Sequence, residues 1–131
     1  MRLIDMITPL ELDSVNERIT EVNFPIQPED LVETEKETRD FYFGKDMNSN
    51  AVIARMNEKG FRPATTREQL KWAPRGWDGK SIVVALGQSW SRSNDNRLIS
   101  VLHSSNGERM LDPAWFDTIW GTYEHFLGVR K

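Results

Sequence analysis

Apolar positions recur at a helical spacing in the middle of the chain and at a strand spacing after it. Asn48 or Ser49 can cap a helix, and Gly60 can end it at the position just past the last turn. The apolar stripe between these two ends consists of Val52, Ile53 and Met56. The spacing therefore predicts one helix between the cap and the glycine.

A second helix is predicted to begin beside Thr65. The hydroxyl of Thr65 can accept a hydrogen bond from an amide of the first turn, and Glu68 can reach back to the amide of Thr65, which completes a capping box. This helix is expected to run over residues 66–72 or 66–73 and to end at Pro74.

The last third of the chain carries a strand pattern. Residues 82–86 are apolar throughout, as in a central strand that is covered on both faces. Asn106-Gly107 is the typical sequence of a two-residue hairpin turn, and Asp112-Pro113 is expected to end the returning strand. Four strands in meander are predicted after the helices, at residues 82–86, 97–103, 108–111 and 123–130. Residues 41–43 form a further candidate strand.

The first 45 residues differ from the rest because they are acidic, irregular in pattern and punctuated by proline. The acidic residues of one stretch are Glu29, Asp30, Glu33, Glu35, Glu37 and Asp40. Residues 31–36 could form a short solvated helix. The chain is thus interpreted as one domain over 1–131, with an acidic N-terminal extension (1–45) and a core (46–131). The acidic run is typical of a solvated face, and the alternative is a surface that docks a basic partner.

Composition narrows the class of protein. With 38% hydrophobic and 28% charged residues among 131, the chain fits an ordinary soluble globule. The net charge of −3 gives the whole molecule no electrostatic reason to bind nucleic acid or an anionic membrane. The N-terminus lacks the pattern of a signal peptide, and no run approaches a membrane span. A cytoplasmic location is the default expectation.

Three segments carry a resemblance to a known family. Residues 60–73 resemble the segment of formylglycine-generating-enzyme-like (sulfatase-modifying-factor) proteins that reads glycine, aromatic, Arg, Leu, Pro, Thr and then an acidic helix. Residues 87–90 look like their Gly-Gly-Ser-Trp element, and residues 126–130 are similar to their closing glycine, Phe and Arg. The ending from Trp115 to Arg130 also looks like that of many small uncharacterised bacterial proteins.

This resemblance implies an α+β fold of the C-type-lectin-like class, in which two helices flank a small antiparallel sheet and the chain ends meet in adjacent strands. The same branch includes the variable proteins of diversity-generating retroelements. One departure decides the chemistry. The enzymatic members oxidise a cysteine with a cysteine-bound copper, and this chain has no cysteine. The leucine between Arg62 and Pro63 is also missing, and the calcium-binding signatures of sugar-binding lectins are not found.

Other candidate chemistry is weak. His103 and His125 both fall on predicted strands, but two histidines without a patterned carboxylate make a poor zinc or acid–base site. Ser89 lacks the glycine at position 91 that a nucleophile elbow needs. Gly76 and Gly79 have the wrong spacing for a phosphate loop. We therefore expect no enzyme activity, no cofactor and no metal.

The tryptophans suggest a recognition face. Trp72 and Trp115 are expected in the core, whereas Trp77, Trp90 and Trp120 either pack under loops or anchor a ligand. In the resembling scaffold, the loops between the middle strands carry the ligand. The residues predicted to contact it are Trp90, Ser91, Arg92, Asn94, Asp95, Asn96, Arg97, Asp117, Trp120 and Tyr123.

Two functions from different classes follow. The first is a non-enzymatic recognition module that binds a protein through the 90–97 and 117–123 loops. The second is a small acidic inhibitor or phage-type effector, whose acidic segment would occupy the basic groove of a nucleic-acid-handling host protein. A protein partner is expected in both cases, with no direct binding of nucleic acid or membrane.

Overall fold

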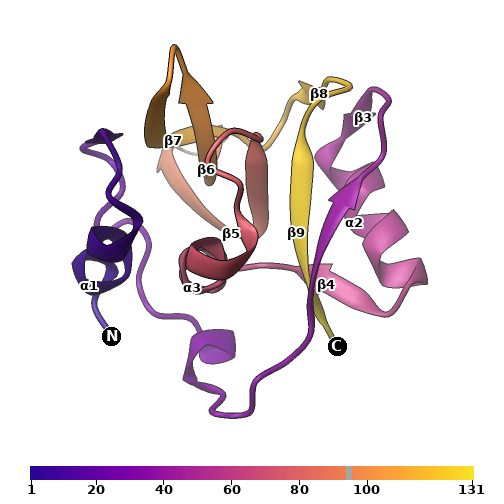
Figure 1. The fold of residues 1–131 in the computed structure, drawn as a ribbon. Coiled ribbons are helices and arrows are strands. Elements are labelled where there is room, and N and C mark those ends of the chain that lie inside the picture. Colours follow the sequence, from indigo (N-terminus) through magenta and orange to yellow (C-terminus); the bar gives the residue numbers. More distant parts are fainter. Residues whose placement is uncertain (94–95) are drawn as a thin grey trace.

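The computed structural model of this protein describes residues 1–93 and 96–131 (Figure 1). The helical elements are α1 (Leu3–Ile7), the 3₁₀ turns η1 (Thr8–Leu10) and η2 (Pro28–Leu31), α2 (Ser49–Glu58) and α3 (Thr66–Gly76). The strands are β1 (Ser14–Val15), β2 (Thr38–Tyr42), β3 (Met47–Asn48), β4 (Phe61–Pro63), β5 (Val83–Ser93), β6 (Asn96–Ser105), β7 (Glu108–Trp115), β8 (Ile119–Trp120) and β9 (His125–Arg130).

One mixed sheet organises the described residues. Its strands follow the order β1-β7-β6-β5-β9-β2, and β4 also pairs with β9, which gives seven strands in the part of the chain that the structure covers. The α+β class predicted from the sequence is confirmed. The sheet is larger than expected, and it is not purely antiparallel, because β1 lies parallel to β7 and β5 lies parallel to β9.

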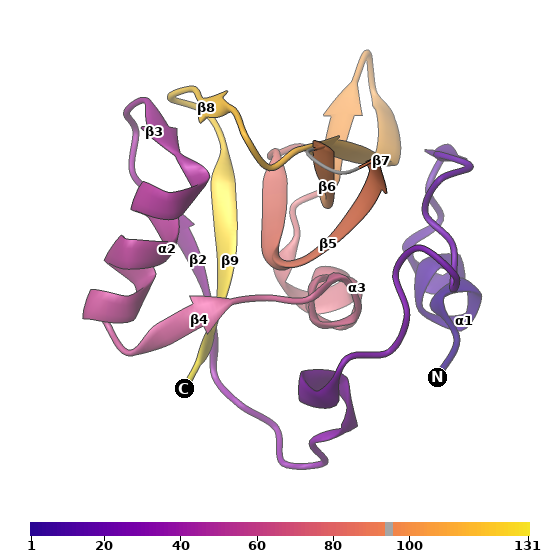
Figure 2. The ribbon, with the colours of Figure 1, turned by 180° about the vertical axis from the view of Figure 1, so that it is seen from behind.

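Both faces of the sheet are covered. Along β6, Ile99 and Val101 belong to the apolar cluster that includes Val52 and Met56 of α2. The next residue along β6, Leu102, belongs to a second cluster with Leu70 of α3, since side chains alternate between the faces of a strand. Figures 1 and 2 show α2 at one end of the molecule and α1 at the other, with α3 between them.

The N-terminal segment is built into this core. The second cluster contains five of its apolar side chains, namely Leu3, Ile7, Leu10, Ile19 and Phe24. Arg67 of α3 is buried and donates hydrogen bonds to the Glu21 carboxylate and to the backbone oxygens of Phe24 (2.7 Å) and Met1 (3.4 Å). The buried clusters therefore do not divide near residue 45, where the sequence pattern changes.

A buried polar network ties α3 to the sheet. Gln69 donates through Nε2 to the oxygen of Val83 (2.9 Å) and accepts at Oε1 from the hydroxyl of Ser100 (2.7 Å). The Thr66 hydroxyl lies 2.9 Å from the Ser100 oxygen. Because the single Ser100 proton goes to Gln69, Thr66 is the donor in this contact. Thr66, Gln69 and Ser100 are all completely buried.

Both predicted helix starts are confirmed. Asn48 caps α2 and accepts from the amide of Ala51 (2.8 Å). Thr65 caps α3, and its capping box with Glu68 is complete in both directions. The Thr65 hydroxyl also donates to Asp30 (2.6 Å), so the same residue fixes η2 against the start of α3.

Two predicted ends, those of α3 and β7, and one predicted helix were wrong. Helix α3 continues through Pro74 to Gly76, because a proline within the last turn removes only one of the few hydrogen bonds left there. Strand β7 continues through Pro113. The strand β1 pairs only with Met110 and Leu111, so beyond Leu111 this side of β7 is a sheet edge in the described chain. A proline is tolerated there, because no neighbouring strand requires a hydrogen bond from its missing N–H. Residues 31–36 are not the predicted helix, since only the 3₁₀ turn η2 reaches Leu31 in the described chain.

The loop predicted over residues 90–97 is also corrected by the structure. Strand β5 runs to Ser93 and β6 begins at Asn96, with Ser91 opposite Arg97 and Ser93 opposite Asn96. The pairing is interrupted by two shifts in register, one between Ala85 and Trp90. Residues 91–93 and 96–97 are therefore paired strand residues, where a loop was expected.

Candidate functional site

The two segments predicted to form a recognition face meet through an ion pair. Arg97, at the start of β6, donates to the Asp117 carboxylate (2.8 Å) across the connection between β7 and β8. Its guanidinium carbon lies 3.9 Å from the centroid of the Phe116 ring, and the Phe116 amide donates to the Arg97 oxygen (2.9 Å). Strand pairing and a cation–π contact thus hold this pair in place.

The other predicted contact residues are placed differently. Ser91 and Asn96 are exposed, and Tyr123 is 78% exposed in the turn before β9. Trp90 is half-buried against the apolar cluster of α1 and α3. Arg92 lies on the backbone of β5. The structure does not describe the Arg92 side chain, and the predicted contact residues Asn94 and Asp95 lie outside the described residues.

Trp120 is buried and does not line the outer surface. Its indole N–H donates to the Ser49 hydroxyl (2.9 Å), which donates to the Phe116 oxygen (2.6 Å). This chain of hydrogen bonds joins the first residue of α2 to the β7–β8 connection. A shallow hollow of about 330 Å³ opens here, lined by Asn48, Ser49, Asn50, Phe116, Asp117, Thr118 and Ile119.

Two exposed apolar residues on this face were missed by sequence reasoning. Trp115 was expected in the core but is 52% exposed at the end of β7, and Ile119 in β8 is 65% exposed. Trp115 pairs with Leu98, next to Arg97. Strand alternation gave no signal for this exposure, because Leu111 and Trp115 are four residues apart and therefore share a face of β7, on which Leu111 is buried.

Both histidines have carboxylate partners that were not predicted from the sequence. His103 lies 2.6 Å from Asp112, and His125 lies 2.8 Å from Asp40 with the Tyr42 ring stacked on it. In the described part of the chain, neither imidazole is hydrogen-bonded to a serine or threonine hydroxyl. The nucleophile, base and carboxylate of a hydrolase are therefore not assembled there.

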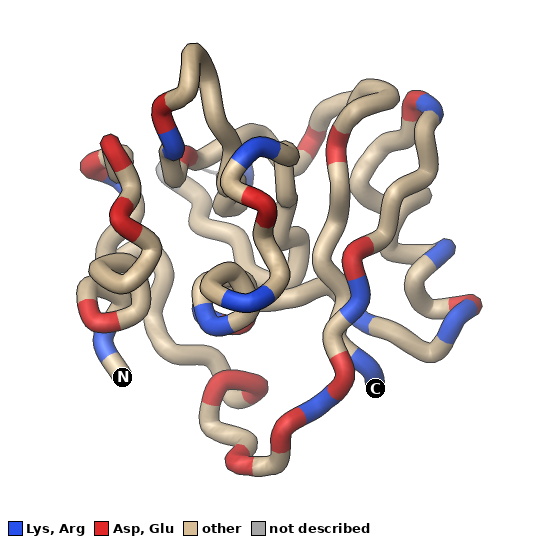
Figure 3. The backbone as a smooth tube through the Cα atoms, in the orientation of Figure 1, with Lys and Arg blue, Asp and Glu red and all other residues tan. Residues whose placement is uncertain are grey.

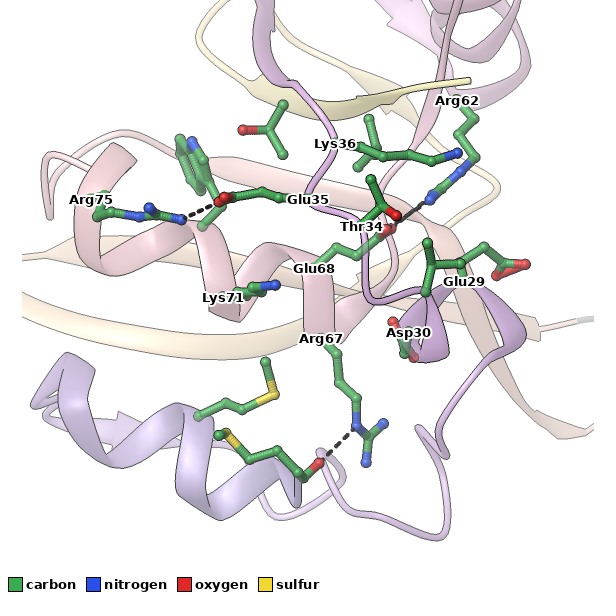
Figure 4. A pocket seen from close by; sticks show the side chains of 16 residues that line it. Glu29, Asp30, Thr34, Glu35, Lys36, Arg62, Arg67, Glu68, Lys71 and Arg75 are labelled. Atoms are coloured by element: carbon green, nitrogen blue, oxygen red, sulfur yellow. Dashed lines mark hydrogen bonds and ion pairs between the residues drawn. The ribbon is translucent and has the colours of Figure 1, made fainter.

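A second cavity lies at the opposite end of the molecule, below α3. It measures about 330 Å³ and is walled by α3, by residues from α1, β4 and β9, and by residues 29–38 (Figure 4). Residues 32–37 connect η2 to β2, and we call them the strap. Figure 3 shows the strap as a stretch of alternating acidic and basic positions that runs below α3.

Most of the strap's acidic groups are already paired. Glu35 bonds Arg75 (3.1 Å), and Glu37 bonds Arg130 (2.8 Å). The hydrogen bond from Arg130 holds the pKa of the Glu37 carboxyl below its usual value. On the cavity wall, Arg62 donates two hydrogen bonds to the Glu68 carboxylate (2.8 and 2.7 Å). These bonds raise the pKa of the Arg62 guanidinium above its usual value.

Comparison with known proteins adds no relative: no family model, curated protein or solved structure matches the chain. Across residues 1–93 and 96–131, none of the helices has the length and apolar character needed to cross a membrane. Over the same residues, no three histidine, aspartate or glutamate side chains gather as ligands for a metal ion.

Proposed function

We propose that this protein is a non-enzymatic recognition module that binds a protein partner through the face around Arg97 and Asp117. The proposal includes the C-type-lectin-like fold. Two observations support this fold. The chain runs from β2 through α2 and α3 to the β5–β6–β7 meander, and the last strand, β9, pairs antiparallel with β2.

The observation that carries the proposal is the set of exposed side chains around a fixed ion pair. Ile119 and Tyr123 are well exposed, and Trp115 is half-exposed beside Arg97. Large amphipathic and apolar side chains next to a held arginine are typical anchors of protein interfaces. Exposed apolar residues of this kind cost little stability to replace, so their role can be tested without unfolding the molecule.

The acidic segment is the competing surface. Glu33 is exposed on the strap and has no partner among the described residues, but Glu35 and Glu37 are held by Arg75 and Arg130. A surface whose acids are paired within its own chain offers less charge to a basic groove. The inhibitor function is therefore the alternative outcome of the test.

A site-specific photo-cross-linking amino acid at position 119 or 123 will identify the partner, with position 33 as the comparison. We expect one protein to be captured from 119 and 123 and not from 33. With that protein purified, Ile119→Ala and Tyr123→Ala should each weaken binding by more than about five-fold, the level of an interface anchor. Val22→Ala, at an 87% exposed residue of the N-terminal segment, is the matched control.

The opposite pattern would reject the proposal. Capture from position 33 alone, with loss of binding in Glu33→Lys and strong dependence on salt, would assign the function to the acidic segment.

A further inference from the structure

We propose that the cavity below α3 is a binding site for a small amphipathic carboxylate, a molecule with one carboxylate group and a short aliphatic or aromatic body. This site is separate from the recognition face, since Figures 1 and 2 place the strap and the β7–β9 connections at opposite ends of the molecule. Its volume of about 330 Å³ is near the lower end of the range of about 300–1,000 Å³ for ligand pockets, so the body must be small.

The charge pattern of α3 supplies the anion-binding group. Arg67, Lys71 and Arg75 follow one another at intervals of four residues and share one face of the helix, where like charges repel. The outer two are neutralised from other segments, Arg67 by Glu21 and Arg75 by Glu35. Lys71 lies between them (Figure 4) and has no carboxylate partner among the described residues.

Two carboxylates of the cavity wall, those of Glu68 and Asp30, are already bound by other groups. Glu68, one turn before Lys71, is held by both guanidinium nitrogens of Arg62 and by the Thr65 amide (2.9 Å). Asp30 accepts from the Thr65 hydroxyl and the Gln27 amide (2.8 Å). A ligand carboxylate would therefore relieve the repulsion on Lys71 without competing with a charge already bound there.

The rest of the wall suits an apolar body. Met6, Val32, Trp72 and Val129 all line the cavity. The indole of Trp72 is fixed, because it packs against two buried clusters and lies directly over Gly76, where a Cβ atom would come within 2.0 Å of the ring nitrogen. A rigid aromatic wall of this kind binds an apolar group with little loss of conformational freedom.

The strap offers a way in. Its contact with α3 on this side is the Glu35–Arg75 ion pair, whose side chains are 69% and 72% exposed. An ion pair this exposed contributes little to stability, so the rim can open at small cost. Lys36 of the strap already forms part of the cavity wall, so it would stay beside a bound ligand when the strap closes.

Isothermal titration with octanoate and with the uncharged octanamide tests the proposal. Octanoate should bind the wild-type protein, and octanamide should bind at least ten-fold more weakly. Lys71→Met, which keeps the length of the side chain and removes its charge, should weaken octanoate binding at least ten-fold and leave octanamide unchanged. Lys45→Met, at an exposed lysine in the connection between β2 and β3, should bind octanoate as the wild type does.

Because Lys71 is exposed, its variant should melt at the wild-type temperature, and melting curves will check this. The proposal is overturned if millimolar octanoate does not bind, if octanamide binds equally well, or if Lys71→Met and Lys45→Met bind octanoate equally. None of these results bears on cross-linking from positions 119 and 123.

Discussion

Replacing Ser100 by alanine should destabilise the fold strongly, although it removes a single oxygen atom. The hydroxyl accepts from Thr66 and donates to Gln69 in a completely buried network between α3 and β6. Its removal leaves the Thr66 donor and the Gln69 Oε1 acceptor without these partners. A buried polar group left unpaired costs about 1–3 kcal/mol. With each of the two groups in the lower half of this range, we expect a loss of about 2–4 kcal/mol in the free energy of unfolding.

Urea unfolding followed by tryptophan fluorescence measures this change. With a denaturant slope of about 2 kcal/mol per molar, the midpoint should fall by about 1–2 M. Ser105→Ala, at an exposed serine near the end of the same strand, is the matched control and should stay within about 0.5 kcal/mol of the wild type.

A double-mutant cycle sharpens the test. Thr66→Val removes the donor that Ser100→Ala leaves unpaired, so the double variant should lose clearly less stability than the sum of the two single variants. The buried network does not stabilise the fold in this way if Ser100→Ala costs less than about 1 kcal/mol, or if the two changes are additive.

Three further changes probe other parts of the fold. Thr65→Ala should lower the free energy of unfolding in urea by about 2 kcal/mol, more than the ~1 kcal/mol of an ordinary cap, because the hydrogen bond to Asp30 is lost as well. A loss no larger than that of Thr8→Ala, at an exposed threonine, would contradict this. Gly87→Ala should prevent stable folding at 25 °C by circular dichroism, because its Cβ would lie 2.3 Å from the Pro63 oxygen, and a native spectrum and melting temperature would refute that contact. Hydrogen bonds from Ser81 hold the pKa of Asp78 below its usual value, so this exposed carboxyl adds a little stability above about pH 4 that is lost on acidification. Asp78→Asn should accordingly reduce the fall in melting temperature between pH 5 and pH 3, and an unchanged fall would exclude that contribution.

The sequence predicted what depends on neighbouring residues. The capping box of Thr65 and Glu68, the cap at Asn48 and the hairpin at Asn106-Gly107 are local, and the structure has all of them. The ends at Pro74 and Pro113 were wrong because the backbone partners that decide whether a proline is tolerated lie elsewhere in the chain. Strands β1 and β4 were missed for the same reason, since each is defined only by its pairing with a distant strand.

The candidate site was predictable only in outline. The two segments of the face were named from the sequence, but the Arg97–Asp117 contact between them depends on how β7 turns into β8. The His103–Asp112 pair did leave a signal. Counting outward from the hairpin turn places His103 opposite Met110, so Asp112 is its diagonal neighbour on the same face.

Strand β9 has a consequence for how fast this molecule reaches its native state. Its partners come from three distant parts of the chain, since Thr38 pairs with Val129, Phe61 with Arg130 and Val83 with His125. Each pairing requires a long loop to close, and the entropy of that closure is lost before the stabilising contacts form. Folding should therefore take milliseconds to seconds. Until β9 docks, β2 has no strand beside it among the described residues, and β5 has an open edge. This partly folded species is the one in which chains would associate with one another.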